Sequence, residues 1–413
     1  MSGYNPKRNE ELKIDVLLSQ AVESADGTRM TGQQGIDKMK EVLTGKGQWP
    51  CDASTAPPEW QDALLLRFFI GFKRNAPVAA EAFGKMLQWR KDNKINEIRD
   101  KIMGGLQPEK FPRYEQLRRF YPLLKTGFDK NGCPIMITLT GLIDPAKLIK
   151  AATLDEIRMY IIYEMEHKLI QLSKLTADTG VLMRALEVHD LKGLGMHHLA
   201  TGPIGLLRKI VSEVSSNYVE LADKVLLLNV PYATVVRSIL KQVVPARSQH
   251  KLAVMGGLAD YQDCLLAHAG RGQYHEYLLG GALPEGLEES GEDDIDKWSS
   301  ISVPARDKKV LQESVGKGKT FLWSVCPASM DVILDVRFVA AKGAVTNLFE
   351  AEDKKIASLQ RGSHLAQEDG AVYVTLDNTY SYINSKTVQY TFESIDVQKQ
   401  VDDAGGPVQP DDI

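Results

Sequence analysis

The stretch HDLKGLGMHH, which runs from His189 to His198, gathers residue types that often do chemistry. Its two glycines resemble the start of a dinucleotide-binding loop, but His198 occupies the place of the third glycine, where a side chain obstructs close packing. His197 and His198 are adjacent and diverge by about 100° on a helix, so they cannot hold one metal without a distant third ligand. Asp190 precedes a turn, where a carboxylate usually caps backbone amides. We therefore predict a structural turn, with neither a nucleotide nor a metal bound to it.

Other enzyme motifs also fail on inspection. GKGKT at 316–320 imitates a phosphate-binding loop, but Glu313 stands where the motif needs glycine, and a strand-like pattern follows in place of a helix. The chain has no GxSxG elbow and no HExxH helix, and its only GSH, at 362–364, lies in a loop-like stretch. We expect no catalytic residues, no metal site and no cofactor, and we predict that the chain is not an enzyme.

Composition limits the class of protein. The 413 residues are 43% hydrophobic and 25% charged, which is typical of a soluble globular protein with two or three domains. The net charge of -4 argues against a nucleic-acid partner. The four cysteines are far apart and lack zinc-site spacing, so we expect reduced thiols. The first residues lack an apolar signal core and no uncharged run approaches the ~18 residues of a membrane span. A cytoplasmic protein with only peripheral membrane contact is expected.

Periodicity divides the chain into segments. Apolar residues recur at three and four residues over the first ~100 positions, which indicates helices. Asn131-Gly132 is a tight-turn signal before a strand at about 134–140, and Thr153 with Glu156 forms a capping box for a long helix. Strands then alternate with helices, which predicts parallel βαβ units. The segments are a helical or flexible start (1–55), N-terminal helices (56–110), an α/β domain (111–284), an acidic linker (285–305), an all-β sandwich (306–397) and a tail (398–413).

The period changes to two in the last third of the chain. In DVILDVRF, Val332, Leu334, Val336 and Phe338 point to one side, and AVYVTLDN and VQYTFES repeat the alternation. Short strands of this kind predict an antiparallel sandwich, with Trp323 and Phe338 in its core.

Several fragments together resemble a known family. GFDKNGCPIMITLTGLID, HDLKGLGMHHL, SSNYVELADKVLLLNVP and VVPARSQHKLAVMGG look like the CRAL-TRIO lipid-binding and lipid-transfer domain. LLLRFFIGFKRN and AFGKMLQWRKD resemble its helical N-terminal extension, while FLWSVCPASMDVILDVRF and LDNTYSYINSKTVQYTFES resemble the GOLD β-sandwich, also described as jelly-roll-like. The resemblance spans about Trp60 to Glu393. The order of domains is similar to that of the tocopherol-associated and supernatant-protein-factor group.

The resemblance implies a lipid pocket whose floor is the sheet and whose mouth is closed by a movable gate helix. In PYATVVRSILKQVV one apolar stripe is compatible with such a gate, while Arg237 and Lys241 lie off it. Periodicity alone favours an ordinary core-facing amphipathic helix, and the resemblance shifts the interpretation toward a gate. The residues of the stripe are Tyr232, Val235, Val236, Ile239, Leu240 and Val243.

The resemblance also implies a headgroup site. In members that bind phosphatidylinositol, a Glu and a Lys frame the gate beside a hydroxyl, and these positions fall on Glu220, Lys251 and Ser248. A lysine offers a charge to phosphate, a serine a donor, and a glutamate acceptors for an inositol hydroxyl. Lys73 is the basic contribution expected from the N-terminal helices. Without the resemblance, the residue types favour a solvated helix end for Glu220 and a solvated strand start for Lys251.

Departures from the family pattern keep the ligand open. Ile70 and Phe72 stand where two arginines are usual, and Glu187 replaces the small hydroxyl residues of phosphatidylcholine binders. A carboxylate in an apolar pocket is costly, so we expect Glu187 to point outward or to pair with a base such as Arg184. Tocopherol, squalene or another isoprenoid therefore competes with phosphatidylinositol as the ligand.

Three functions follow, in order of preference. The first is a cytosolic lipid carrier or sensor that exchanges one hydrophobic ligand during transient contact with Golgi, endosomal or plasma membranes. The second is a secretory-traffic adaptor in which the GOLD sandwich recruits a protein partner and the pocket is secondary. The third, an enzyme that uses the glycine turn, requires a nucleotide.

Overall fold

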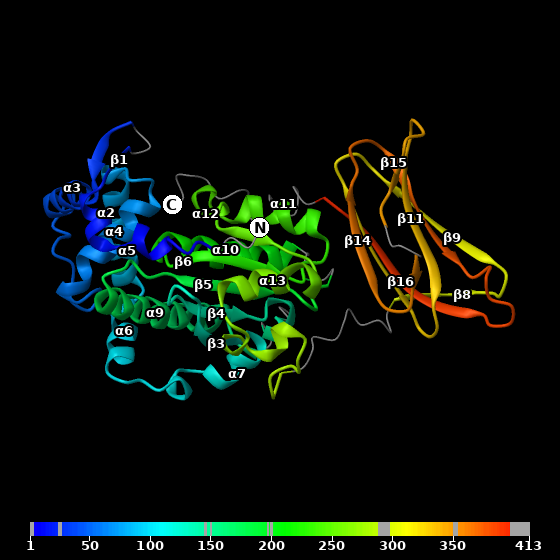
Figure 1. The fold of residues 1–413 in the computed structure, drawn as a ribbon, viewed down its shortest axis with the longest axis horizontal. Coiled ribbons are helices and arrows are strands. Elements are labelled where there is room, and N and C mark those ends of the chain that lie inside the picture. Colours follow the sequence, from blue (N-terminus) through cyan, green and yellow to red (C-terminus); the bar gives the residue numbers. More distant parts are fainter. Residues whose placement is uncertain are drawn as a thin grey trace.

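The computed structural model describes residues 4–23, 27–143, 147–148, 151–195, 198, 201–287, 298–349 and 354–396. Three layers follow one another along its longest axis in Figure 1: N-terminal helices, a central α/β unit and a C-terminal β-sandwich. The predicted tail (398–413) lies outside the described residues, as do His197 and residues 288–297 of the predicted acidic linker (285–305). The predicted end of that linker is wrong, because Ser299–Val303 form strand β8, which pairs with the last strand of the sandwich. Among the residues described, no helix is both long and apolar enough to cross a membrane.

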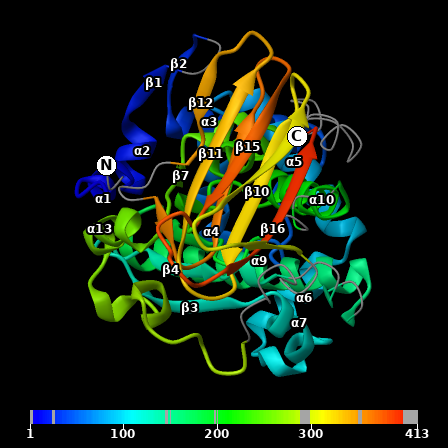
Figure 2. The same cartoon turned by 90° about the vertical axis from the view of Figure 1, so that its right-hand side faces the viewer.

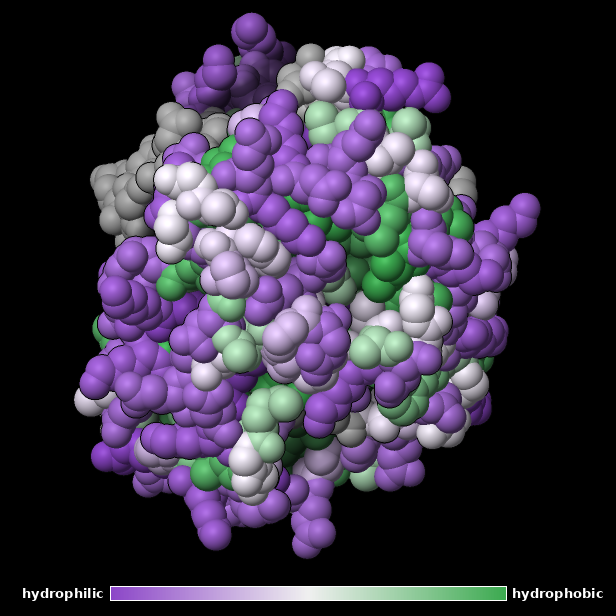
Figure 3. Space-filling view, turned by 90° about the vertical axis from the view of Figure 1, so that its left-hand side faces the viewer, coloured by the Kyte–Doolittle hydropathy of each residue, from purple (hydrophilic) through white to green (hydrophobic). Residues whose placement is uncertain are grey.

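The N-terminal layer is mostly helical, as predicted, but it also contains a short antiparallel hairpin that periodicity did not reveal. The hairpin pairs Ala21 with Thr31 and Glu23 with Arg29. Its elements are α1 (Arg8–Glu11), α2 (Ile14–Ser19), β1 (Ala21–Glu23), β2 (Arg29–Thr31), α3 (Gly32–Gly45), α4 (Pro58–Gly71), α5 (Ala76–Asp92) and α6 (Ile95–Met103). Figure 3 shows that this end of the molecule is mainly hydrophilic, with hydrophobic residues gathered in small areas between polar ones.

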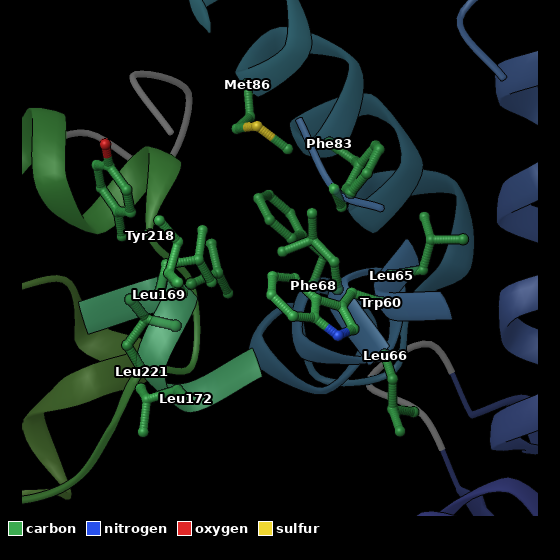
Figure 4. Packing of buried hydrophobic residues seen from close by; sticks show 14 of the residues in the cluster. Trp60, Leu65, Leu66, Phe68, Phe83, Met86, Leu169, Leu172, Tyr218 and Leu221 are labelled. Atoms are coloured by element: carbon green, nitrogen blue, oxygen red, sulfur yellow. The ribbon is translucent and has the colours of Figure 1, made fainter. Parts of the chain in front are cut away.

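An aromatic core joins these helices to the α/β unit. Phe68 of α4 and Phe83 of α5 meet edge to face with ring centroids 5.1 Å apart, and both are fully buried. Leu169 and Leu172 of the long helix α9 (Leu154–Thr179) belong to the same cluster, as Figure 4 shows. Such burial of large apolar side chains is the main favourable contribution to folding.

A buried ionic network crosses the same interface. Glu166 of α9 accepts from Arg90 of α5 at 2.7 and 3.2 Å and from Arg99 of α6 at 3.3 Å, and the Tyr218 hydroxyl donates to it at 2.8 Å. Glu166 is fully buried and each arginine is nearly so. The Glu166 carboxylate thus connects α5 and α6 to α9.

The central unit is built on a five-stranded sheet in the order β3-β4-β5-β6-β7. The predicted parallel arrangement is confirmed for β4 to β7, whereas β3 pairs antiparallel with β4 after the turn at Asn131-Gly132. The remaining elements of the unit are α7 (Tyr114–Phe120), β3 (Leu123–Phe128), β4 (Pro134–Thr138), β5 (Ala185–Asp190), α10 (Thr201–Asn217), β6 (Ala222–Leu228), α11 (Ala233–Val243), α12 (Ala246–Gln249), β7 (Leu252–Val254) and α13 (Leu258–His268), with 3-10 turns at Pro108–Lys110, Thr140–Leu142, Arg271–Gln273 and Glu276–Leu279.

The two faces of this sheet differ. Ile137, Val188 and Leu226 lie in a packed cluster with Tyr261 and Leu265 of α13. Alternate residues point to the opposite face, because successive strand side chains change sides. That second face carries the site described below.

The C-terminal unit is a sandwich of antiparallel sheets, as predicted. One sheet has the order β14-β10-β16-β8, and the other has β12-β11-β15-β9 with β13 paired to β11. Figure 2 looks onto this unit. Trp323 and Phe338 are both in its core, which confirms their predicted positions. The strands are β8 (Ser299–Val303), β9 (Lys308–Val315), β10 (Thr320–Pro327), β11 (Val332–Ala340), β12 (Val345–Asn347), β13 (Lys355–Ile356), β14 (Gln360–Leu365), β15 (Gly370–Asp377) and β16 (Lys386–Ile395).

Candidate functional site

A cavity of about 430 Å³ lies between the second face of the central sheet and helices α9 and α10. This volume is in the range of small-molecule sites. Its walls are mostly apolar: Ile161 and Met165 come from α9, Val211 and Val214 from α10, and Val225 from β6. The space is therefore suited to hydrocarbon.

Polar residues meet the cavity where β6 and β7 begin. Glu220 lies two residues before β6 and Lys251 directly precedes β7, and both line the cavity together with Ser248. The structure thus brings the three predicted headgroup residues together. Lys251 is only 7% exposed, so the alternative interpretation of it as a solvated strand start is wrong.

The Glu220 carboxylate is paired twice. It accepts from Lys251 Nζ at 2.9 Å and from Arg184 Nη2 at 2.8 Å. Burial alone raises the carboxyl pKa, but the positive charges of Arg184 and Lys251 outweigh it and hold the pKa of Glu220 below its usual range. Burial lowers the pKa of Lys251, opposed by the Glu220 charge. Lys251 also donates to the Ala222 carbonyl at 3.0 Å, so the protein uses two of its three donors within the described residues.

The backbone at Glu220 is unusual. Its φ of 58° lies in the left-handed region, which is costly for a residue with a Cβ and persists where neighbours fix it. Arg67 of α4 supplies one such restraint by donating to the Glu220 carbonyl at 2.8 Å. Gly71 of the same helix permits a close approach to this segment, because a Cβ there would lie 2.3 Å from Val219 Cγ1. The N-terminal helices therefore set the position of Glu220 through the backbone.

A basic residue other than the predicted Lys73 lines the cavity. Lys73 is exposed and is not among the residues that line the cavity. Arg247 lines the cavity instead: its guanidinium stacks over Phe72 at 4.6 Å and donates to the Ser215 carbonyl at 2.7 Å. Arg247 was not predicted from the sequence, although it is adjacent to Ser248, which was predicted to lie at the headgroup site.

A second group of polar side chains lines the cavity. Glu187 on the central strand β5 accepts from Lys168 Nζ of α9 at 3.0 Å, and His189 Nε2 lies 3.9 Å from its other oxygen. The His189 Nδ1 is 3.1 Å from Thr140 Oγ1. Burial lowers the pKa of His189, while the nearby Glu187 charge opposes that shift. Glu187 thus pairs with a base, as one of the two expectations had it, but the base is Lys168; Arg184, the example given, pairs with Glu220 instead.

Replacing Lys168 with methionine is expected to destabilise the fold by about 1–3 kcal/mol, because it leaves the Glu187 carboxylate in the cavity without its cation. The double variant K168M/E187L is expected to recover most of this loss, since buried pairs are often replaceable by apolar residues. Urea unfolding of parent, single and double variants measures both effects. Equal stability of parent and single variant would show that the pair contributes nothing.

The turn after β5 also contributes to the cavity wall, through Leu194 and His198. The Gly195 amide donates to His198 Nδ1 at 3.0 Å, and His198 Nε2 lies 2.7 Å from the Ile143 carbonyl. Asp190 accepts from the Lys192 amide at 3.0 Å and from Asn229 Nδ2 at 2.7 Å. The predicted structural roles of His198 and Asp190 are confirmed. Among the described residues, no group of three His, Cys, Asp or Glu is placed to bind a metal.

Comparison with known proteins agrees with this geometry. The family model of the CRAL/TRIO domain matches residues 119–270, which contain the sheet and most of the cavity wall. This part of the chain is a CRAL/TRIO domain. The predicted family is thereby confirmed for the central unit.

Curated relatives match about half of this chain. The chain is 26% identical over 215 residues to phosphatidylinositol/phosphatidylcholine transfer protein SFH7 of Arabidopsis thaliana, covering 51% of this chain and 38% of that protein. It is 25% identical over 241 residues to the SEC14 cytosolic factor of Yarrowia lipolytica, covering 57% and 45%. The crystal structure of Sfh5 aligns with a TM-score of 0.42 at 18% identity, over 54% of this chain and 79% of that one. The chain therefore spans less than half the length of these two curated relatives.

Helix α11 of the CRAL/TRIO domain carries the predicted gate stripe. Tyr232, Val235, Val236, Ile239 and Val243 are buried and Leu240 is partly buried, yet none of them is among the residues that line the cavity. Val244, directly after the helix, does line it. The stripe packs against Leu191 and Leu227 of the domain and against Leu322 and Ile395 of the sandwich.

Proposed function

We propose that this chain is a lipid-binding and lipid-transfer protein that holds one hydrophobic ligand in the CRAL/TRIO cavity and exchanges it at membranes. The observation that carries the proposal is the combination of an apolar cavity with a charged group at one end. The named activity of the relatives, transfer of phosphatidylinositol and phosphatidylcholine, supports the same class of ligand. We assign the chain no catalytic role and no cofactor other than the bound lipid.

The ligand we propose is a phosphatidylinositol-type phospholipid. Acyl chains fit the apolar wall formed by α9, α10 and the sheet, while Lys251, Ser248 and Glu220 offer a cation, a hydroxyl and acceptors to an inositol phosphate. Tocopherol or another isoprenoid is the second candidate, favoured by Glu187 and His189, which line the otherwise mostly apolar cavity and could bind the one hydroxyl of such a ligand.

Exchange at a membrane follows from the energetics of burial. Ten methylene groups kept from water contribute about 8 kcal/mol, which is roughly a million-fold in equilibrium. Release into water is therefore slow. We propose that α11 acts as the gate and that the protein works in the cytosol with transient membrane contact, because a bilayer offers the ligand an apolar destination.

We also propose that the C-terminal sandwich is a GOLD domain. Its two antiparallel sheets support that assignment. A protein partner is the second candidate role for this unit, favoured by Tyr382 and Ile383, which are 77% and 88% exposed in the loop between β15 and β16. Exposed apolar side chains on loops are typical of docking sites.

The proposal predicts that the purified chain carries one lipid. Native mass spectrometry is expected to show a mass excess that corresponds to a single ligand, and a lipid extract is expected to be enriched in phosphatidylinositol over the host membrane. Lipid-free protein that also transfers no phosphatidylinositol between vesicles would exclude the carrier. Empty protein that captures vesicle-coat or Golgi components would favour the adaptor.

A further inference from the structure

Strand β10 of the sandwich is buried on both faces. Phe321, Trp323 and Val325 point into the sandwich core, as one face of each sheet must. Leu322 and Ser324 point the other way, and both are 0% exposed. An antiparallel sheet usually leaves its second face in water. A further element must therefore cover this part of the sheet.

That element is the gate helix. Leu322 and Ile395 belong to the same buried cluster as the α11 stripe, and α11 lies against β14. Figure 1 shows α11 on the side of the CRAL/TRIO domain that faces the sandwich. The Tyr232 hydroxyl, at the start of α11, is 2.8 Å from Ser324 Oγ in a buried hydrogen bond. The contact thus has an apolar centre and one directional polar pair.

The exposed side of α11 is basic. Arg237 and Lys241 are solvent-exposed, and the helix ATVVRSILKQV contains no acidic residue. A helix with an apolar stripe beside basic residues suits the surface of an anionic bilayer, where the stripe enters the interface and the cations meet headgroups. The sandwich covers the stripe that such a surface requires.

We infer that the sandwich is a latch on the gate helix, and that an anionic lipid bilayer competes with β10 and β16 for the apolar face of α11. Release of the latch then frees the helix to dock on the membrane and to open the cavity. This inference rests on the proposed lipid-transfer function. We favour a bilayer over a protein groove as the competitor, because the charged residues of α11 beside its apolar face are all basic.

Replacing Leu322 with glutamate tests the latch. The variant is expected to transfer fluorescent phosphatidylinositol roughly tenfold faster than the parent between vesicles of phosphatidylcholine with phosphatidylserine, and less so without phosphatidylserine. Hydrogen exchange of the α11 amides is expected to rise in the absence of vesicles. Val310→Glu is the matched control, because Val310 is 53% exposed on β9 of the other sheet. Unchanged exchange and unchanged transfer in L322E would overturn the latch.

A milder variant guards against loss of folding. Tyr232→Phe removes only the hydroxyl that meets Ser324, so a two- to tenfold rise in α11 exchange is expected from the loss of one hydrogen bond. If L322E lacks a cooperative melting transition, Y232F decides: exchange equal to that of the parent refutes the latch. If the parent transfers no lipid, the proposed function fails, and α11 exchange still reports on the latch.

Discussion

Replacing Glu166 with alanine is expected to lower the free energy of unfolding by about 3–5 kcal/mol. The carboxylate is fully buried and is bound by two arginines and a tyrosine hydroxyl. Its removal leaves Arg90 and Arg99 as buried cations without an anion, which is more costly than the loss of any single hydrogen bond. Urea unfolding measures the effect. Glu81→Ala is the matched control, because its pair with Lys85 is more than half exposed on both sides and should contribute under 1 kcal/mol.

The difference in the free energy of unfolding between the parent and E166A should depend on pH. Burial raises the pKa of Glu166, but the charges of Arg90 and Arg99 and the Tyr218 hydrogen bond outweigh it, so the pKa in the folded protein is lowered. A group with a lowered folded pKa stabilises above its unfolded pKa, and this contribution is lost as the pH falls through the folded value. We therefore expect this difference in unfolding free energy to be constant near neutral pH and to become smaller under acid conditions. A gap that widens on acidification would contradict the assignment.

Replacing Lys251 with methionine is expected to reduce phosphatidylinositol transfer by about ten- to hundredfold, the equivalent of one charge-assisted contact. Glu220→Gln is expected to act in the same direction, because the carboxylate positions the Lys251 ammonium at 2.9 Å. Methionine keeps most of the apolar stem of the lysine, so the cavity wall changes little. Transfer of phosphatidylcholine should fall less in both variants.

Lys209→Ala provides the control for a generic loss of positive charge, since Lys209 is exposed on α10. Melting curves establish that the variants are folded. We expect K251M to fold, because the Glu220 carboxylate retains its pair with Arg184. Equal phosphatidylinositol transfer by the parent and by both folded variants would remove Glu220 and Lys251 from the headgroup site.

Local patterns predicted the elements that carry strong periodicity. The alternation of Val332 to Phe338 placed β11 and its buried face correctly, and the Thr153–Glu156 capping box marked the start of α9. The hairpin β1-β2 was missed because its strands have only three residues each, too few for a period to be seen. The structure also fixes part of the supposedly flexible start: Arg8 is buried and pairs with Asp223 at 3.1 Å. A contact across 215 residues leaves no local signal.

The partner of Glu187 shows where a better prediction was possible. Residues three apart along an extended segment point to opposite faces, so Arg184 could not reach the cavity beside Glu187. Lys168 was identifiable in principle, since it follows Glu164 by one turn and Ile161 by two on the same side of a long helix. The covering of β10 by α11 was beyond reach, because the alternation within a strand does not identify what lies on its outer face.

Helix α9 serves two neighbours at once. One side holds Glu166 in the ionic network of the N-terminal helices, while Lys168 and Met165, within two residues of it, form part of the cavity wall. With 26 residues it behaves as a rod about 39 Å long. Tightly packed interiors transmit displacements. A tilt of α9 caused by a change at Arg90 or Arg99 would therefore also move the cavity wall. Substitutions in the N-terminal helices, outside the cavity, are thereby expected to change the affinity for the ligand.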